Sequence, residues 1–198
     1  METTAQDCLR AYSPRPFTVD EYYRMADAGI LDEGDRVELI HGCIVVRERP
    51  SPPHAGHITR LIRLFSALLR DRVLVSAQNP IEIDEYNHPQ PDIALLRPRD
   101  DFYETAHPTP ADVYLLVEVA LTSVRADQRE KVPLYARAGI RELWIVNLRD
   151  GIIEVYSDPS TDGYRGISNL EPGSRLSISA FTDVELSIDE TSRALTAG

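Results

Sequence analysis

The stretch from Asp112 to Val119 limits the possible folds of this chain more than any other part of the sequence. It reads VYLLVEV over residues 113–119, so it is apolar at odd and at even positions alike. Side chains of a β-strand point alternately to the two faces of the sheet, and an apolar strand of this kind needs cover on both faces. We therefore expect a central strand of a sheet that is covered on both sides.

Helical and strand-like patterns alternate on either side of this strand. The clearest helix is expected over residues 54–70, where apolar side chains recur with the helical period. A helix over 18–28 is expected to begin with a capping box between Thr18 and Glu21. The other expected elements are a hairpin at 37–46, strands at 73–77, 81–83, 91–96, 143–146 and 152–156, a helix at 125–138, and weak strands at 175–186. This alternation in a short chain predicts an α/β fold.

The length and composition fit one globular domain. We expect a loose leader at 1–16, the domain at 17–190 and a tail at 191–198. The net charge of −11 argues against broad, nonspecific binding of nucleic acid but leaves a local site open. No apolar run is long enough to span a membrane, no secretory signal is present, and Cys8 and Cys43 match no zinc spacing or disulfide framework. These features predict a cytoplasmic protein with reduced thiols and no membrane partner.

Two acidic residues begin or interrupt apolar strands. Glu118 has apolar neighbours on both sides, and a buried carboxylate is costly unless it is paired or binds a metal. The alternative is that Glu118 lies in water at the edge of a sheet. Asp92 follows Pro91 at the start of a predicted strand, which is also a common place for an ordinary aspartate. The combination of Asp92 with Glu118 makes the pair a stronger candidate for a functional site than either residue is alone.

Lys131 is the only lysine in the chain, whereas the other 20 basic residues are arginines. A compact ammonium group can do chemistry that a guanidinium cannot, so a single lysine in an arginine-rich chain suggests a specific role. The alternatives are chance and a helix-stabilising pair with Asp127 at i−4. Lys131 lies in the helix predicted at 125–138, where Pro133 indicates either a kink or a later helix start.

Pro91-Asp92 followed by Glu118-Val119-Ala120 resembles the PD-(D/E)XK nuclease signature, in which two acidic residues on adjacent strands hold a divalent metal. Several further motifs stand in the order expected of the Uma-two family, a large family of bacterial proteins expected to be endonucleases. The motifs are FTVDEY at 17–22, RVELIHG at 36–42, PHA at 53–55, QPDIA at 90–94, LVEVA at 116–120, EKVPLYARAG at 130–139 and ELWIV at 142–146. The resemblance implies a restriction-endonuclease-like fold, with a mixed β-sheet core flanked by helices and an N-terminal helix and hairpin.

The resemblance also implies the catalytic residues. Asp92 and Glu118 would bind the metal, and Glu38 would complete the metal shell. Lys131 would be the catalytic lysine, displaced onto the following helix from its usual position two residues after the second acid. Ala120 stands at that usual position and can do no chemistry.

Three further residues would support this set without taking part in the chemistry themselves. His54 matches the histidine of the family at the head of the long helix; the alternative is a histidine that only packs or caps there. Asp127 and Tyr135 stand four residues before and after Lys131, so all three share one helix face.

This set predicts a metal-dependent endonuclease that hydrolyses phosphodiester bonds of nucleic acid, with DNA as the expected substrate. The expected cofactor is Mg²⁺ or Mn²⁺ held by carboxylate oxygens, and the expected assembly is a homodimer. The alternatives are a catalytically inactive nuclease-fold module that binds nucleic acid or protein, an assembly protein acting through a dimer surface, and a metalloenzyme acting on another phosphodiester. The predicted nucleic-acid contacts are Arg60, Arg63, Arg70 and Arg97, each of which could instead simply lie in solvent.

Overall fold

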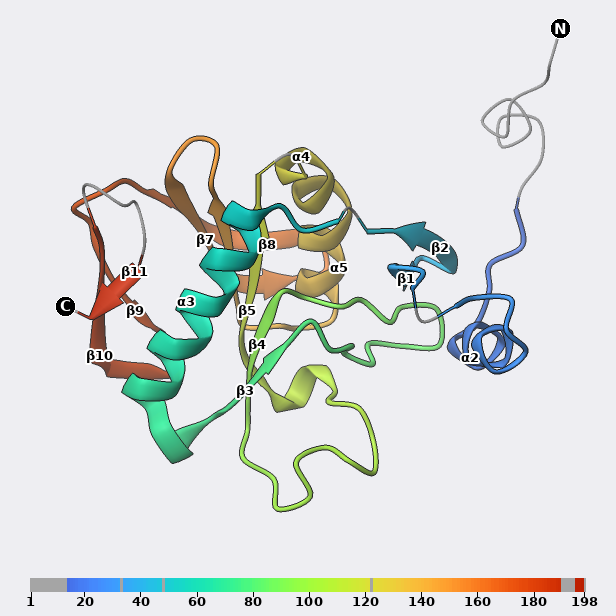
Figure 1. The fold of residues 1–198 in the computed structure, drawn as a ribbon. Helices are drawn as coiled ribbons and strands as arrows, with labels where there is room; N and C mark the ends of the chain where they lie inside the picture. The colour runs from blue at the N-terminus through green and yellow to red at the C-terminus, as the bar shows by residue number, and fades with distance from the viewer. Residues whose placement is uncertain (1–13, 33, 48, 122, 190–194, 198) are drawn as a thin grey trace, which may run out of the picture. The chain divides into compact units, whose positions relative to one another are not determined.

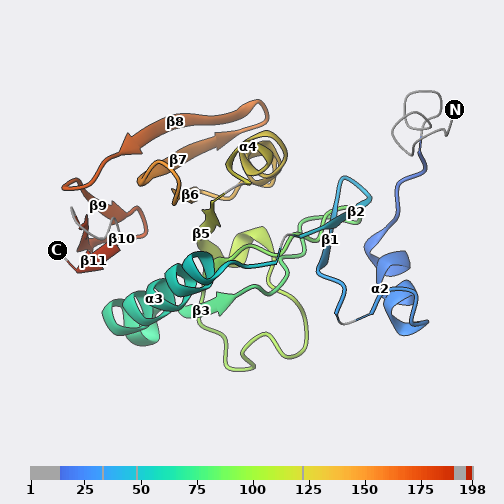
Figure 2. The same ribbon diagram turned by 45° about the horizontal axis from the view of Figure 1, so that its top comes forward.

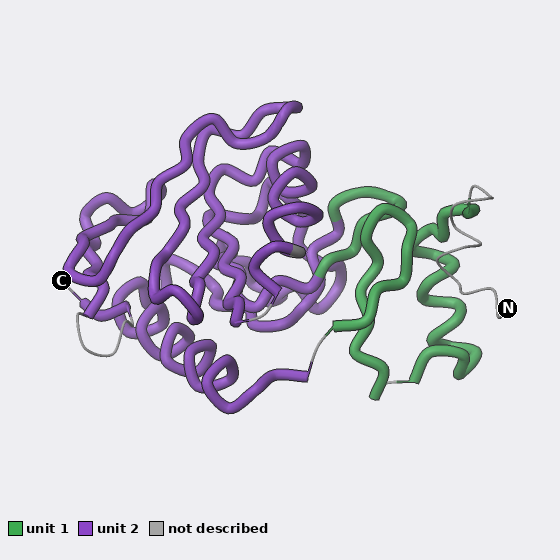
Figure 3. Tube along the Cα trace, turned by 90° about the horizontal axis from the view of Figure 1, so that it is seen from above, with its two compact units in different colours: residues 1–48, 83–89 green, residues 49–82, 90–198 purple. Residues whose placement is uncertain are grey.

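The computed structural model describes residues 14–32, 34–47, 49–121, 123–189 and 195–197 (Figure 1). Most of the predicted leader therefore lies outside the described residues. The chain divides into two compact units, residues 1–48 with 83–89 and residues 49–82 with 90–198 (Figure 3). The single domain predicted over 17–190 stays a prediction, because compactness alone does not tell whether the two units fold separately.

The smaller unit contains the predicted N-terminal helix and hairpin. Helix α2 (Val19–Asp27) begins with the expected capping box: the Glu21 N–H donates to Thr18 Oγ1 and the Thr18 N–H donates to Glu21 Oε2. The hairpin joins β1 (Val37–Ile40) to β2 (Cys43–Val46) in antiparallel register. Both of these elements are confirmed at almost the predicted bounds.

The larger unit is built on a mixed sheet of six strands in the order β3-β4-β5-β6-β7-β8. Strands β5 and β6 are parallel, and the other neighbouring pairs are antiparallel. The strands are β3 (Leu74–Ala77), β4 (Ile93–Leu96), β5 (Val113–Ala120), β6 (Glu142–Asn147), β7 (Ile152–Ser160) and β8 (Gly163–Leu170). The α/β fold with a central β5 is thus confirmed, since this strand has a neighbour on each side and is buried over almost its whole length.

The strand predicted over 81–83 is wrong. The Glu82 N–H donates to Pro108 O, and the Ile83 N–H donates to Asn87 O, so the backbone bonds of this segment go to loop residues. Ile81 is nevertheless fully buried. Burial in an irregular segment therefore accounts for the apolar residues that suggested a strand.

One face of the six-stranded sheet is covered by the long helix and by a small second sheet. Helix α3 (Pro52–Leu69) packs its buried face, which includes Leu61 and Phe65, into one core with Val117 and Trp144. Figure 2 shows α3 beside the small antiparallel sheet, which contributes Leu176, Ile178 and Leu186 to the same core. That sheet consists of β9 (Arg175–Ile178), β10 (Phe181–Ile188) and β11 (Leu195–Ala197).

The connection from β5 to β6 carries the other helical layer. Parallel neighbours need a crossover, and this one consists of α4 (Val124–Ala126), a π-helical turn (Asp127–Lys131) and α5 (Val132–Arg137). The helical segment begins at Val124, so the late helix start is wrong, and the π-helical turn directly before α5 is the irregularity that precedes Pro133. Two short 3₁₀ helices, Arg70–Arg72 and Pro110–Asp112, complete the elements. Of the helices in the described ranges, none is both long enough and apolar enough to cross a membrane.

Candidate active site

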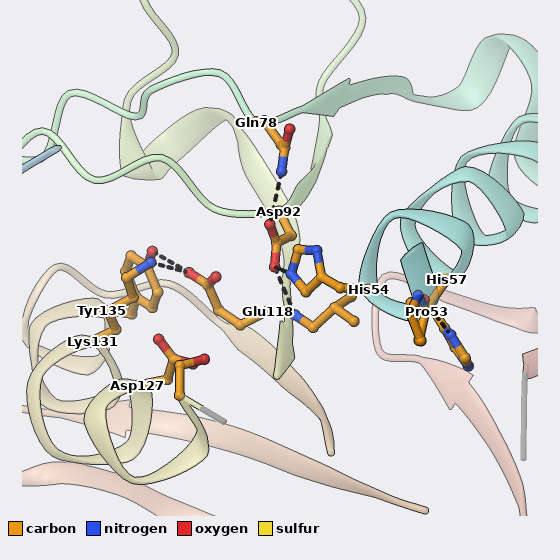
Figure 4. A network of polar contacts seen from close by, with 11 residues as sticks. Pro53, His54, His57, Gln78, Asp92, Glu118, Asp127, Lys131 and Tyr135 are labelled. Atoms are coloured by element: carbon orange, nitrogen blue, oxygen red, sulfur yellow. Dashed lines mark hydrogen bonds and ion pairs between the residues drawn. The ribbon is translucent and has the colours of Figure 1, made fainter. Parts of the chain in front are cut away.

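The Asp92 carboxylate lies directly before β4 and is 4% exposed. The Val119 N–H donates to its Oδ2 at 2.9 Å, and His54 Nε2 lies 3.1 Å from the same oxygen. Gln78 Nε2 donates to Oδ1 at 3.3 Å (Figure 4). Since an ionised carboxylate can only accept, the His54 nitrogen must be the donor in its pair. Residues from α3, from β5 and from the turn after β3, all in the larger unit, therefore hold the Asp92 carboxylate.

These contacts keep Asp92 charged. Burial raises the pKa of the carboxyl, but the hydrogen bonds from His54, Val119 and Gln78 and the charge of His54 lower the pKa by more. The net effect is a pKa below the usual range. Asp92 is therefore a carboxylate at neutral pH, the form that a divalent cation requires.

Glu118 lies beside Asp92 on the neighbouring strand. Ile93 pairs with Val117 in the antiparallel register of β4 and β5, which makes Asp92 and Glu118 cross-strand neighbours. Glu118 is 3% exposed, so the alternative of an edge position in water is wrong. Two carboxylates thus stand side by side in a buried part of the sheet.

The crossover brings two donors to Glu118 from one helix face. Lys131 Nζ donates to Glu118 Oε1 at 3.2 Å, and the Tyr135 hydroxyl donates to the same oxygen at 2.8 Å (Figure 4). Lys131 is 7% exposed and Tyr135 is fully buried. The ammonium of the only lysine is thereby fixed next to the carboxylate pair.

Hydrogen bonds anchor the π-helical turn that carries Lys131 on both sides. Ser123 Oγ donates to the buried Asp127 carboxylate at 2.8 Å. Gln128 Nε2 donates at 2.7 Å to Glu154 of β7, a carboxylate that also accepts the Tyr156 hydroxyl. Turns of π-helix are rare and occur often at functional sites. These anchors hold the turn, and with it Lys131, over the sheet.

The carboxylate oxygens at this site suit a hard divalent cation. Mg²⁺ typically binds through one or two carboxylates and keeps several waters. Among the residues that the structure describes, no three histidine, cysteine or acidic side chains meet as a metal-binding group. Asp92 and Glu118 are two carboxylates that could serve as such ligands.

A family model described as "Uma2: Putative restriction endonuclease" matches residues 19–189. The chain belongs to the Uma2 (Uma-two) family. A crystal structure described as "a putative nuclease belonging to DUF820" from Anabaena variabilis is similar, with a TM-score of 0.71 and 16% sequence identity. The match covers 89% of this chain and 98% of that chain, and at this identity it shows that the fold is shared. The comparison with curated proteins gives no match.

Five of the residues suggested by the resemblance to the Uma2 family meet at this site. Listed along the chain, they are His54, Asp92, Glu118, Lys131 and Tyr135. Asp127 lies on the same helical segment as Lys131 (Figure 4). Glu38 is buried in β1 of the smaller unit, and its role as a third metal ligand stays a prediction.

The four arginines predicted to contact nucleic acid lie at exposed positions of the larger unit. Arg60 and Arg63 lie on the side of α3 away from His54, by 100° per residue, and Arg70 lies at the opposite end of that helix. Arg97 donates to Ala111 O and lies over the Tyr114 ring. Their role in binding nucleic acid stays a prediction.

Two donors to Asp92 were not found from the sequence. The Val119 N–H is a backbone group, and its direction depends on strand register. Gln78 stands 14 residues before Asp92, and only the pairing of β3 with β4 brings the two together. The segment Gln78-Asn79-Pro80 carries a turn signal but no sign of chemistry.

Proposed function

We propose that this member of the Uma2 family is a metal-dependent endonuclease that hydrolyses phosphodiester bonds in DNA. The proposal rests on one observation: Asp92 and Glu118 lie side by side, and Lys131 donates a hydrogen bond to Glu118. The family description and the nuclease-like fold of the Anabaena variabilis structure support a nuclease. The choice of DNA over RNA comes from the restriction-endonuclease likeness.

Each residue of the set has a task that its contacts support. Asp92 and Glu118 would hold Mg²⁺ or Mn²⁺ through their carboxylate oxygens. When bound, the cation supplies Lewis-acid polarisation of the phosphate and lowers the pKa of water. Lys131 would orient the attacking water and offset the negative charge that builds on the phosphate. His54 would keep Asp92 ionised and oriented, as its hydrogen bond does without metal.

The proposal is tested by following cleavage of supercoiled plasmid, single-stranded DNA and RNA with Mg²⁺, with Mn²⁺ and with EDTA. We expect the wild type to nick the plasmid only when metal is present, and Asp92→Ala to lose that activity. Glu185→Ala is the matched control, because it removes an exposed carboxylate on β10 that forms an ion pair with Arg175. Equal nicking by wild type and Asp92→Ala, or nicking that EDTA does not stop, would contradict the proposal.

Tyr135→Phe is expected to lower the cleavage rate about tenfold, because Glu118 loses a hydrogen bond that fixes its orientation. Tyr164→Phe is a matched control: it removes a buried hydroxyl that donates at 2.8 Å to Ile140 O. Both variants are expected to lose about 1 kcal/mol of unfolding free energy in urea. Equal cleavage by the two variants would mean that the Tyr135 hydroxyl only stabilises the fold.

Two further expectations from the sequence stay predictions. The homodimer is to be checked by the mass of the particle in solution with and without DNA. The cytoplasmic location belongs to the same proposal, since an enzyme that cleaves DNA must share a compartment with its substrate.

A further inference from the structure

The backbone of Gln78 adopts a conformation that glutamine rarely takes. Its φ is +55°, and it is one of six non-glycine residues with positive φ in the described ranges. Side chains with a Cβ are disfavoured in this left-handed region, where glycine carries no penalty. Strained residues of this kind occur often at functional sites. The positive φ alone does not distinguish Gln78 from the other five, but its backbone N–H and its side-chain amide both donate to Asp92.

The strained turn directs two donors of Gln78, its backbone N–H and its side-chain amide, to Asp92. The Gln78 N–H donates to the Asp92 backbone carbonyl at 3.2 Å, which extends the β3–β4 pairing by one step beyond Ala77 and Ile93. Its side chain folds back so that Nε2 donates to Asp92 Oδ1 at 3.3 Å (Figure 4). The turn therefore fixes where the amide stands relative to the carboxylate.

The amide completes the orientation of the Asp92 carboxylate. His54 and the Val119 N–H both contact Oδ2, which fixes the position of that oxygen. Rotation about the Cβ–Cγ bond moves both oxygens together, so the Gln78 amide at Oδ1 opposes the same rotation from the other oxygen of the carboxylate. As a neutral donor, the amide leaves the negative charge of the carboxylate for a cation, whereas an arginine or lysine in its place would neutralise it.

We propose that Gln78 is a positioning residue, which sets the Asp92 carboxylate in the orientation that binds the divalent cation. This inference rests on the proposed metal-dependent function. Hydrogen-bond partners of metal ligands orient those ligands, and their loss typically lowers metal affinity about 10- to 100-fold. The amide of Gln78 acts on Asp92 and does not itself touch the substrate.

The test measures Mn²⁺ binding to the full chain by titration calorimetry, which does not depend on cleavage. Gln78→Met keeps the length of the side chain without a donor, and Gln78→Gly removes the amide while relaxing the backbone. We expect both variants to raise the Kd for Mn²⁺ about tenfold or more. Asn79→Ala is the control, because the neighbouring amide donates to Ser76 Oγ instead of Asp92, and its Kd should equal that of the wild type.

A purely structural role gives a different pattern. Gln78→Gly would then bind Mn²⁺ as the wild type does, because glycine suits the turn, and that result would overturn the inference for Gln78 alone. If the inference is correct, Gln78→Gly unfolds in urea no earlier than the wild type and still binds Mn²⁺ weakly. Cleavage by Gln78→Met should also recover as the Mn²⁺ concentration rises, with KM for DNA unchanged. A wild type that binds no Mn²⁺ would overturn both this inference and the proposed function.

Discussion

Replacing Lys131 with arginine is expected to lower metal-dependent cleavage about a hundredfold or more, although the positive charge is kept. Lys131 is buried, and its Nζ lies 3.2 Å from Glu118 Oε1, beside the Tyr135 hydroxyl. A guanidinium is planar and larger than an ammonium, and its donors point in fixed directions. It therefore cannot place a single N–H group where Lys131 Nζ stands, next to Glu118 and to the water that Lys131 is proposed to orient.

The arginine variant separates a chemical role of Lys131 from simple charge pairing. Arginine is a good partner for a carboxylate, so a role limited to the ion pair with Glu118 predicts nearly wild-type cleavage by Lys131→Arg. Lys131→Met removes the charge altogether and leaves a buried carboxylate without its cation. We expect Lys131→Met to be destabilised by about 3–5 kcal/mol, measured by urea unfolding. Arg137→Lys, at an exposed position of α5, is the control and should cleave plasmid at the wild-type rate.

The sequence predicted the parts of the fold that show a clear apolar pattern. The central strand β5 and the helix α3 are buried on the faces that their periodicity indicates. Strand β8 was not predicted, because it lies at one edge of the sheet and exposes polar residues such as Ser168 and Asn169 along with Ile167. A strand that is open to solvent and interrupted by Gly166 carries no apolar run to detect.

The candidate site likewise contains residues that the sequence singles out and residues that it does not. Glu118 and Lys131 could be chosen from the sequence because a charge inside an apolar strand and a single lysine are unusual, and Asp92 could be chosen through its combination with Glu118. Gln78 could not be chosen, because its role depends on a backbone angle and on strand pairing. Pro133 indicated an irregularity in this helix, but the π-helical form of the preceding turn could not be predicted, since the residues of that turn are those of an ordinary helix.

Glu142→Ala is expected to lower the free energy of unfolding by about 4 kcal/mol, because it leaves three donors without an acceptor. Glu142 is 3% exposed at the start of β6, and its Oε1 accepts the Trp144 indole N–H at 2.7 Å. Its Oε2 accepts both the N–H and the hydroxyl of Ser179, in the turn between β9 and β10. This carboxylate thus ties the six-stranded sheet to the three-stranded sheet. The expected loss is a large part of the roughly 5–15 kcal/mol that stabilises a typical domain.

Urea unfolding followed by fluorescence suits this test, because Trp144 is the only tryptophan and is fully buried. Glu142→Gln should lose less than Glu142→Ala, since its amide oxygen can still accept from one side. Glu185→Ala is the matched control: its ion pair with Arg175 is exposed, and such pairs contribute about 0–1 kcal/mol. A Glu142→Ala variant as stable as Glu185→Ala would mean that water replaces the lost carboxylate. The two sheets would then be held together by their apolar core, through residues such as Ile178 and Leu186, without help from this link.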